Sequence, residues 1–425
     1  MQRGDDRELD LVVFGATSFV GQILCRVLVE RHGVPGDGVP GDGVPGGTSG
    51  DEGGGLRWAI AGRSADKLAA VARDTGADVE RIVVDATDRA ALDAMAARTK
   101  VVVSTVGPYA LYGSDLVAAT VAAGTDYCDL TGETQWMRQM IDAHQDDAVA
   151  SGARIVHACG FDSIPSDMGV WFTQRQAVER FGVPCEQVSM RVRSMRGGAS
   201  GGTLASMFNM MEEAASDAEL RRMLADPYAL APVDQRHGVA QDEMRRPTRD
   251  DTGDWTAPFV MAAVNTRVVH RSHALAGRPW GPSFRYDEAM DMGRGPLGVA
   301  KAGALTAGLG AGVGLAAIGP TRRLLERVLP SPGEGPSPIA QARGSFELRF
   351  TGRTAEGDTI RTSVTGDRDP GYGCTARMLA EAASVLVDLD RNEVAGGFWT
   401  PSTALGEHLY ERLEAHAGVR FEVLG

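Results

Sequence analysis

The segment with the clearest chemical use is the glycine-containing stretch LVVFGATSFVG, residues 11–21. An apolar run stops at Gly15 and apolar residues recur at helical spacing after it, which predicts a strand, a tight turn and a helix. The N–H groups and the dipole at such a helix start favour a pyrophosphate. Gly15 permits the turn, and Gly21 lets the helix lie close to the strand. The residues expected to bind a dinucleotide here are Gly15, Thr17, Ser18, Phe19, Val20 and Gly21.

Ser18 departs from the usual fingerprint, because a three-glycine loop has its middle glycine at this position. Its side chain could either crowd the pyrophosphate or donate a hydroxyl to it. Both outcomes stay open at the level of the sequence.

Polar residues at two further strand ends indicate which nucleotide binds. The second predicted strand, residues 57–61, is followed by Arg63 and Ser64 instead of the acidic residue that NAD sites use for the ribose. An arginine fork and a hydroxyl suit a 2′-phosphate, so NADP(H) is the predicted cofactor. Asp85 follows the third strand, where it would touch the adenine edge or only cap a turn.

A fourth predicted strand, residues 101–104, leads into the loop VGPYALYG, residues 106–113. In a doubly wound sheet this strand end faces the same crevice as the glycine loop. Val106, Gly107 and Pro108 are therefore expected to form the floor of a nicotinamide site, with tyrosines at its rim.

Strands and helices alternate through the first 160 residues, which predicts a doubly wound parallel sheet of the Rossmann type. The repeated GVPGD unit within residues 33–55 predicts a flexible surface insertion. Beyond residue 165 the pattern changes to an α+β domain with a mainly antiparallel sheet. Strand-like patterns occur at residues 266–273, 344–351 and 359–364, and the last two predict a hairpin.

Composition excludes several classes of protein. A net charge of −13 and a pI near 5.2 argue against nucleic-acid binding. Five scattered cysteines without CxxC spacing predict reduced thiols and no metal site, in a cytoplasmic protein. Residues 302–321 carry no charge but few large aliphatic side chains. They predict either a surface helix that touches lipid or an acyl chain, with peripheral membrane association, or an ordinary buried helix.

Seven segments in order along nearly the whole chain resemble saccharopine-dehydrogenase-like oxidoreductases, in the branch that includes bacterial trans-acting enoyl reductases. The segments are GATSFVG (15–21), AGRSADKL (61–68), VGPYALYG (106–113), AGTDYCDLTGE (123–133), CGFDSIPSDMG (159–169), GGTLASM (201–207) and GGFWTPSTALGEHLYERL (396–413). The resemblance implies an NADP-binding domain over residues 1–165, an inserted substrate and dimerisation domain over 166–395, and a segment 396–425 that packs back on the first domain. It also implies a reductase of lipid or polyketide acyl chains, which are presented by the carrier protein of a separate synthase. A homodimer is a further expectation.

Enoyl reduction requires a hydride at the β-carbon, stabilisation of an enolate and a proton at the α-carbon. Tyrosine, histidine and carboxylic acid groups suit the last two tasks. The expected catalytic candidates are Tyr109, Tyr112, Tyr127, His157 and Asp162. Each has a plain structural alternative, since tyrosines beside a Gly-Pro turn often only pack and Asp162 could cap a helix.

Two other functions remain open from the sequence. A saccharopine-reductase-like amino-acid dehydrogenase would need several arginines for its carboxylates, and Arg191, Arg193 and Arg196 alternate along one predicted strand. Alternatively, the chain is a non-catalytic, membrane-associated protein that retains the fold, which Ser18 and residues 302–321 would favour.

Overall fold

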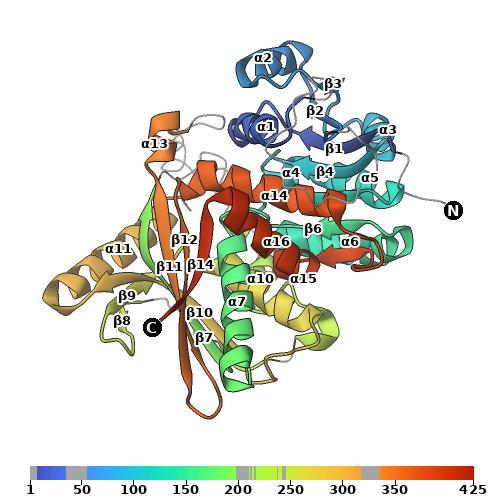
Figure 1. Ribbon diagram of the computed structural model, residues 1–425. Coiled ribbons are helices and arrows are strands. Elements are labelled where there is room, and N and C mark those ends of the chain that lie inside the picture. Colours follow the sequence, from blue (N-terminus) through green and yellow to red (C-terminus); the bar gives the residue numbers. More distant parts are fainter. Residues whose placement is uncertain are drawn as a thin grey trace. The chain divides into compact units, whose positions relative to one another are not determined.

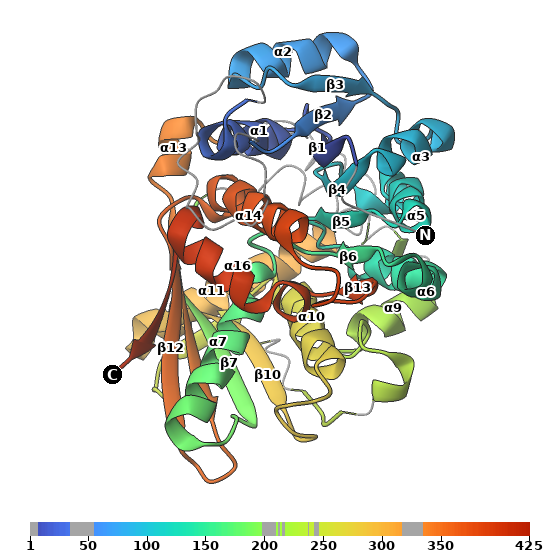
Figure 2. The ribbon, with the colours of Figure 1, turned by 45° about the vertical axis from the view of Figure 1, so that its right-hand side comes forward.

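The computed structural model describes residues 7–34, 55–197, 210, 213–214, 217–236, 238–241, 246–316 and 335–425. The chain divides into two compact units, each with its own sheet (Figures 1 and 2). Unit 1 comprises Met1–Thr131, Gln139–Gly160 and Thr375–Arg412; unit 2 comprises Gly132–Arg138, Phe161–Cys374 and Leu413–Gly425. Residues 375–412 thus group with the N-terminal strands and residues 413–425 with the other unit, whereas the expected limits lay at 165 and 395.

A seven-stranded parallel sheet forms the centre of unit 1, in the order β13-β6-β5-β4-β1-β2-β3 (Figure 1). Its strands are β1 (Leu9–Phe14), β2 (Trp58–Gly62), β3 (Glu80–Val83), β4 (Thr99–Ser104), β5 (Asp126–Asp129), β6 (Arg154–Val156) and β13 (Gly397–Trp399). β1 and β2 are buried along their whole length, as expected for a parallel sheet that helices cover on both faces. The order reverses between β1 and β4, and ligands of doubly wound sheets bind at such a point. The predicted Rossmann-type domain is confirmed.

Helices follow the strands of this sheet at the predicted places. They are α1 (Phe19–His32), α2 (Ala65–Thr75), α3 (Arg89–Ala97), α4 (Tyr109–Tyr112), α5 (Ser114–Ala123), α6 (Thr134–Ser151, which starts in unit 2), α14 (Thr375–Asp388), α15 (Pro401–Ala404) and α16 (Gly406–Arg412). α14 packs against α1, β4 and β5 within unit 1 (Figure 2). The Arg154 guanidinium is 2% exposed and donates hydrogen bonds to the Asp126 carboxylate and to the carbonyl oxygens of Leu386 and Leu389. It therefore ties the C-terminal end of α14 to β5 and β6.

The second sheet contains seven strands in the order β14-β12-β11-β7-β10-β9-β8. They are β7 (Gln187–Arg196), β8 (Thr248–Arg249), β9 (Trp255–Pro258), β10 (Arg285–Gly293), β11 (Ser345–Arg353), β12 (Thr359–Gly366) and β14 (Val419–Leu424). β7 and β10 pair in parallel and the other pairs are antiparallel, so the sheet is mixed, and the expectation of a mainly antiparallel sheet is corrected. The parallel pair needs a long crossover, which the chain between residues 196 and 285 provides. The β11–β12 hairpin was predicted and is confirmed.

The expected strand at residues 266–273 is wrong, because these residues belong to helix α10 (Ala262–Leu275). Ten of the fourteen residues of α10 are buried, including arginines that donate to backbone carbonyl oxygens, such as Arg267 to Leu224. The unbroken buried run from Arg267 to Ala274 hides the helical periodicity, so its β-branched residues imitate a strand. The other helices of this unit are α7 (Ile164–Phe181), α9 (Ala218–Ala225), α11 (Gly295–Ala316) and α13 (Pro338–Ala342), with short helices η1 (Val233–Gln235), η2 (Pro370–Cys374) and η3 (Leu413–Ala417).

Some predicted segments fall wholly or mostly outside the described residues. They are the insertion at 33–55, the segment GGTLASM at 201–207, and the end of the 302–321 segment. α11 covers the first part of that last segment. Among the helices that the structure describes, none has the length and apolar character needed to span a bilayer.

Candidate functional site

The turn after β1 requires both of its predicted glycines. Gly15 has a φ of +87°, and a Cβ built on it would lie 2.4 Å from Cγ2 of Val106. A Cβ on Gly21 would lie 2.3 Å from the carbonyl oxygen of Gly15. Backbone therefore approaches backbone where a dinucleotide site needs its phosphate loop, and the loop after β4 is in contact with it. Thr17, Phe19 and Val20 complete the turn and begin α1.

Ser18 is the N-cap of α1. Its Oγ accepts a hydrogen bond from the Gly21 N–H at 2.9 Å and lies 2.9 Å from Oγ1 of Thr105. Thr105 in turn donates to the Gly15 carbonyl oxygen at 2.9 Å. The Ser18 hydroxyl thus fastens the phosphate loop to the end of β4, a contact that neither sequence alternative included.

Arg63, Ser64 and Asp85 lie after β2 and β3, on the adenosine side of the strand-order reversal. Ser64 caps α2, and the Arg63 side chain is exposed. Asp85 is exposed, and hydrogen bonds from the backbone and hydroxyl of Thr87 lower its pKa, with a smaller contribution from Arg63. Arg63 and Asp85 are therefore close enough to interact, and a solvent-exposed cation stands where NADP sites place one.

The carboxyl ends of β5 and β6 bring together an acid and a histidine. Nδ1 of His157 lies 2.7 Å from Oδ2 of Asp129, and both side chains are buried. The other oxygen of Asp129 accepts hydrogen bonds from the backbone N–H groups of Thr131 and Ala158, each at 3.1 Å. Ala158 has a φ of +61°, a strained conformation for a non-glycine residue that is common at functional sites. The carboxylate is thus fixed on both oxygens, and it holds the imidazole ring in one orientation.

The three tyrosines that were predicted as catalytic candidates lie in different surroundings. Tyr127 is fully buried with its ring centroid 6.0 Å from that of His157, and burial together with the Asp129 carboxylate raises the pKa of Tyr127 well above its usual range. Tyr109 is 3% exposed, and its hydroxyl donates to the Ser104 carbonyl oxygen at 3.0 Å. Tyr112 is 43% exposed. Tyr127 therefore joins His157 directly, Tyr109 links the ends of β4 and β5, and Tyr112 lies at the surface.

The loop after β4 lies against the glycine turn that follows β1. The peptide bond between Gly107 and Pro108 is cis, and Val106 contacts the position above Gly15. Asp129 and Thr105 were not among the site residues predicted from the sequence. A usable signal existed for Asp129, because an acid and a histidine end two consecutive predicted strands and parallel strand ends meet at one edge of a sheet.

Asp162 belongs to unit 2, where burial raises its pKa to about 6. A Cβ on Gly132, in the same unit, would lie 3.7 Å from its Oδ2. A second buried acid of unit 2, Glu288, accepts hydrogen bonds from the Tyr286 hydroxyl at 2.7 Å and from the Asn265 side-chain amide at 3.0 Å. Burial raises the pKa of Glu288 to about 7, and these hydrogen bonds oppose the rise.

Replacing Glu288 by glutamine is expected to change how stability depends on pH. The pKa is raised from 4.5 to about 7 on folding, so this group's contribution to stability is complete below pH 4.5 and is lost as the pH rises through about 7. As the pH rises from 4.5 to above 7, the free energy of unfolding of the parent protein should therefore fall by ~3 kcal/mol relative to that of the variant. Urea unfolding at pH 5 and pH 8 measures the difference. Glu422→Gln, at an exposed position, is the control, and equal pH dependence in parent and Glu288→Gln would contradict the assignment.

All five cysteines are buried free thiols. Within the described residues, no three histidine, cysteine or acidic side chains gather closely enough to hold a metal ion.

Comparisons with known proteins agree with the Rossmann-type fold of unit 1. The NADP binding domain family of saccharopine dehydrogenases matches residues 49–156. Two mycobacterial relatives are named for trans-acting enoyl reduction: a Mycobacterium tuberculosis protein is 40% identical over 436 residues, covering 98% of this chain and 97% of its own, and a Mycobacterium bovis protein is 39% identical over 430 residues, covering 97% of each. Saccharopine dehydrogenase (L-Glu forming) from Saccharomyces cerevisiae has a similar structure, with a TM-score of 0.53, 13% identity, and coverage of 98% of this chain and 100% of that one. This last likeness concerns the fold.

Proposed function

The chain belongs to the trans-acting enoyl reductase family, and we propose that it reduces an α,β-unsaturated acyl thioester supplied by a lipid or polyketide synthase. Its class, an NADP-dependent oxidoreductase, follows from the near full-length relatives and from the matched NADP binding domain. NADPH supplies the hydride for the β-carbon of the substrate. The close approach of Gly15 and Gly21 fits a dinucleotide, because side chains at these positions would collide with backbone or with Val106.

The observation that carries the mechanism is the 2.7 Å contact between His157 and Asp129 at the carboxyl ends of β6 and β5. Negative charge develops on the thioester oxygen during reduction, and the α-carbon must then receive a proton. We assign that proton to Nε2 of His157. Asp129 binds Nδ1 and so holds the ring in the orientation that points Nε2 away from the carboxylate.

Tyr127 is the proposed donor of a hydrogen bond to the enolate oxygen. Its raised pKa keeps the phenol neutral, and a neutral hydroxyl donates a hydrogen bond to a developing oxyanion. Tyr109 would keep the ends of β4 and β5 together, since its own hydroxyl is engaged with Ser104. Tyr112, whose side chain is exposed, would contact the substrate chain.

The arginines that would favour an amino-acid dehydrogenase are largely neutralised. Arg191 forms an ion pair with Asp287 at 2.8 Å, and Arg193 forms one with Asp291 at 2.7 Å. Two of the three guanidinium groups are thus engaged by carboxylates of β10, which supports acyl reduction over binding of a multiply charged amino acid. The Ser18 contacts with Gly21 and Thr105 likewise argue against a disabled loop and a purely structural role.

A substrate panel tests this proposal. The protein is mixed with NADPH and either crotonyl-N-acetylcysteamine, a small enoyl thioester, or a semialdehyde with an amino acid. We expect NADPH oxidation only with the thioester. Oxidation only with the semialdehyde mixture would instead identify an amino-acid dehydrogenase. The carrier-protein partner, a homodimer, a cytoplasmic location and peripheral lipid contact through α11 remain proposals of the same account.

Replacing Arg63 by alanine is expected to weaken NADPH binding about 10- to 100-fold, because one charge-assisted contact with the 2′-phosphate is worth ~1.5–3 kcal/mol. NADH lacks that phosphate, so its affinity should not change. Fluorescence titration with both nucleotides measures the effect. Lys67→Ala removes a nearby exposed positive charge from α2 and serves as the control. Equal losses for NADPH and NADH would remove Arg63 from the phosphate site.

A further inference from the structure

Unit 2 contains a pocket of about 920 Å³ on one face of its mixed sheet. Gln187, Ser189 and Arg191 of β7 line it, while the alternate residues of that strand are buried on the opposite face. On β10, Asp287 lines the pocket, whereas its neighbour Glu288 contacts Asn265 of α10. The pocket therefore lies on the sheet face opposite α10. None of its lining residues belongs to unit 1, which contains the glycine turn and the contact between His157 and Asp129.

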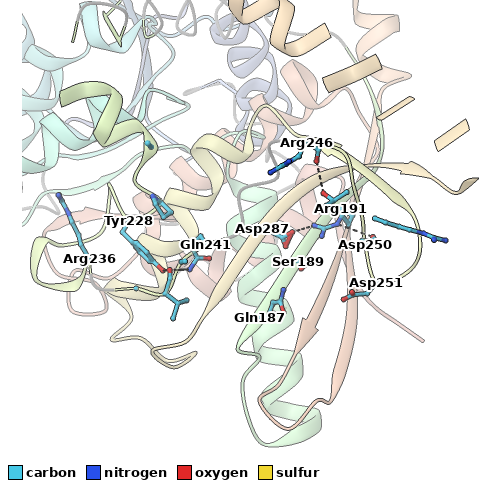
Figure 3. Close-up of a pocket in the computed structure, with 17 residues that line it drawn as sticks. Gln187, Ser189, Arg191, Tyr228, Arg236, Gln241, Arg246, Asp250, Asp251 and Asp287 are labelled. Carbon is cyan, nitrogen blue, oxygen red and sulfur yellow. Dashed lines mark hydrogen bonds and ion pairs between the residues drawn. The ribbon is translucent and has the colours of Figure 1, made fainter. Parts of the chain in front are cut away.

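Hydrogen bonds fix the wall that covers this face. The Tyr228 hydroxyl donates to the carbonyl oxygen of Val239 at 2.8 Å. The Gln241 side chain donates to the Phe284 carbonyl oxygen at 3.1 Å and accepts from the Tyr286 N–H at 3.0 Å. Figure 3 shows Tyr228 and Arg236 at one end of the pocket and Arg246 with Asp250 at the other, with β7 passing between them. The cavity is thus a built feature with polar groups along its length.

The charges in this pocket do not cancel. Arg191 is paired with Asp287, and Asp251 is paired with Arg353, which lies outside the pocket. Oδ1 of Asp250 accepts hydrogen bonds from the N–H groups of Thr252 and Asp254. The remaining lining arginines are Arg236, Arg246 and Arg249.

Arg236, Arg246 and Arg249 have no carboxylate partner among the residues that the structure describes. Nε of Arg236 and Nε of Arg249 donate only to backbone carbonyl oxygens, of Ala231 and Gly253 respectively. Within the described part of the chain, three arginines that pair with no acid thus share one pocket, although the net charge of the protein is −13.

We propose that this pocket binds a small polar molecule that carries a phosphate group. Guanidinium groups match phosphate oxygens as paired hydrogen-bond donors, and several of them suit a dianion better than a singly charged carboxylate. Gln187 and Ser189 add an amide and a hydroxyl to the floor, which favours a ligand body with its own polar groups. The site is separate from the reductase chemistry of unit 1 and does not depend on it.

Isothermal titration with three probes tests the proposal: inorganic phosphate, 4′-phosphopantetheine, and pantetheine, which has the same body without the phosphate. None of the probes contains adenosine, so none imitates NADPH. We expect 4′-phosphopantetheine to bind and pantetheine not to bind. Arg246→Gln should weaken binding at least about tenfold, which corresponds to loss of one charge-assisted contact with the phosphate, whereas Arg236→Gln, at the other end of the pocket, should weaken it less.

Arg222→Gln is the matched control, because this arginine lies on α9 in the same unit but does not line the pocket. NADPH binding by every variant reports whether the chain is folded. Binding of inorganic phosphate but not 4′-phosphopantetheine would support the site and identify free phosphate as its ligand. Equal binding of pantetheine and 4′-phosphopantetheine, equal losses in Arg222→Gln, or no binding of either phosphate probe would overturn the proposal.

Discussion

Replacing His157 by glutamine is expected to lower kcat for enoyl-thioester reduction by about 10²- to 10⁴-fold, the usual contribution of a positioned general acid. The glutamine amide can still donate a hydrogen bond to Asp129, but it cannot release a proton. The Kd for NADPH should stay within about twofold of the parent value, because His157 is assigned no contact with the phosphates. Steady-state kinetics and fluorescence titration measure the two quantities on the same preparations.

Two further variants make this result specific. Asp129→Asn keeps the shape of the acid but replaces one carboxylate oxygen by an amide group, which disturbs the orientation of the His157 ring, so kcat should fall as well. Tyr112→Phe removes a hydroxyl from an exposed side chain and should leave kcat nearly unchanged. If His157→Gln retained the parent kcat while Tyr127→Phe lost it, the proton donor would be the tyrosine and the assignment to His157 would be wrong.

Replacing Arg154 by methionine is expected to lower the free energy of unfolding by ~3 kcal/mol, because the buried Asp126 carboxylate would keep only the more distant and more exposed Arg391, 3.3 Å away. Asp126 is 1% exposed and Arg154 is 2% exposed. The same change also leaves the carbonyl oxygens of Leu386 and Leu389, at the end of α14, without a donor. Chemical denaturation monitored by circular dichroism measures the loss.

The more exposed pair between Arg57 and Asp10 provides the comparison. Arg57 is 48% exposed and Lys100 stays 3.0 Å from the Asp10 carboxylate, so Arg57→Met should cost no more than about 1 kcal/mol. The double change Arg154→Met with Asp126→Leu should recover much of the lost stability, because it leaves no buried charge. If the two single arginine variants lost equal stability, Arg154 would not be the tie between β6 and α14.

The Rossmann half of the fold was predictable because its signals are local. Apolar runs that end at Gly15 or Gly62 and helices that are capped by Ser18 or Ser64 can be recognised within a window of about twenty residues. The direction of the β7–β10 pairing is different, since it depends on a crossover of nearly ninety residues that no local pattern encodes. α10 was missed for a different reason, because the unbroken run of buried residues from Arg267 to Ala274 hides the amphipathic pattern of the helix.

The candidate site was predictable by type but not in its geometry. The sequence offered both Tyr109 and Tyr127 as catalytic candidates, yet the Tyr109 hydroxyl is held by the Ser104 carbonyl oxygen while Tyr127 lies against His157. The partner of His157 was not identified, because Asp129 is 28 residues away in sequence and meets it only through strand pairing. Ser18 was expected to face the cofactor, whereas its hydroxyl contacts Thr105. Such contacts depend on which strands become neighbours.

A single-turnover reaction with deuterated NADPH tests the central claim most directly. The protein is mixed with NADPH carrying deuterium at the transferable position and with crotonyl-N-acetylcysteamine in ordinary water, and the product is analysed by mass spectrometry and NMR. The account predicts a saturated thioester with one deuterium at the β-carbon and one solvent-derived hydrogen at the α-carbon. Unchanged thioester under conditions where NADPH binding is saturated, or deuterium delivered to the carbonyl carbon, would contradict it.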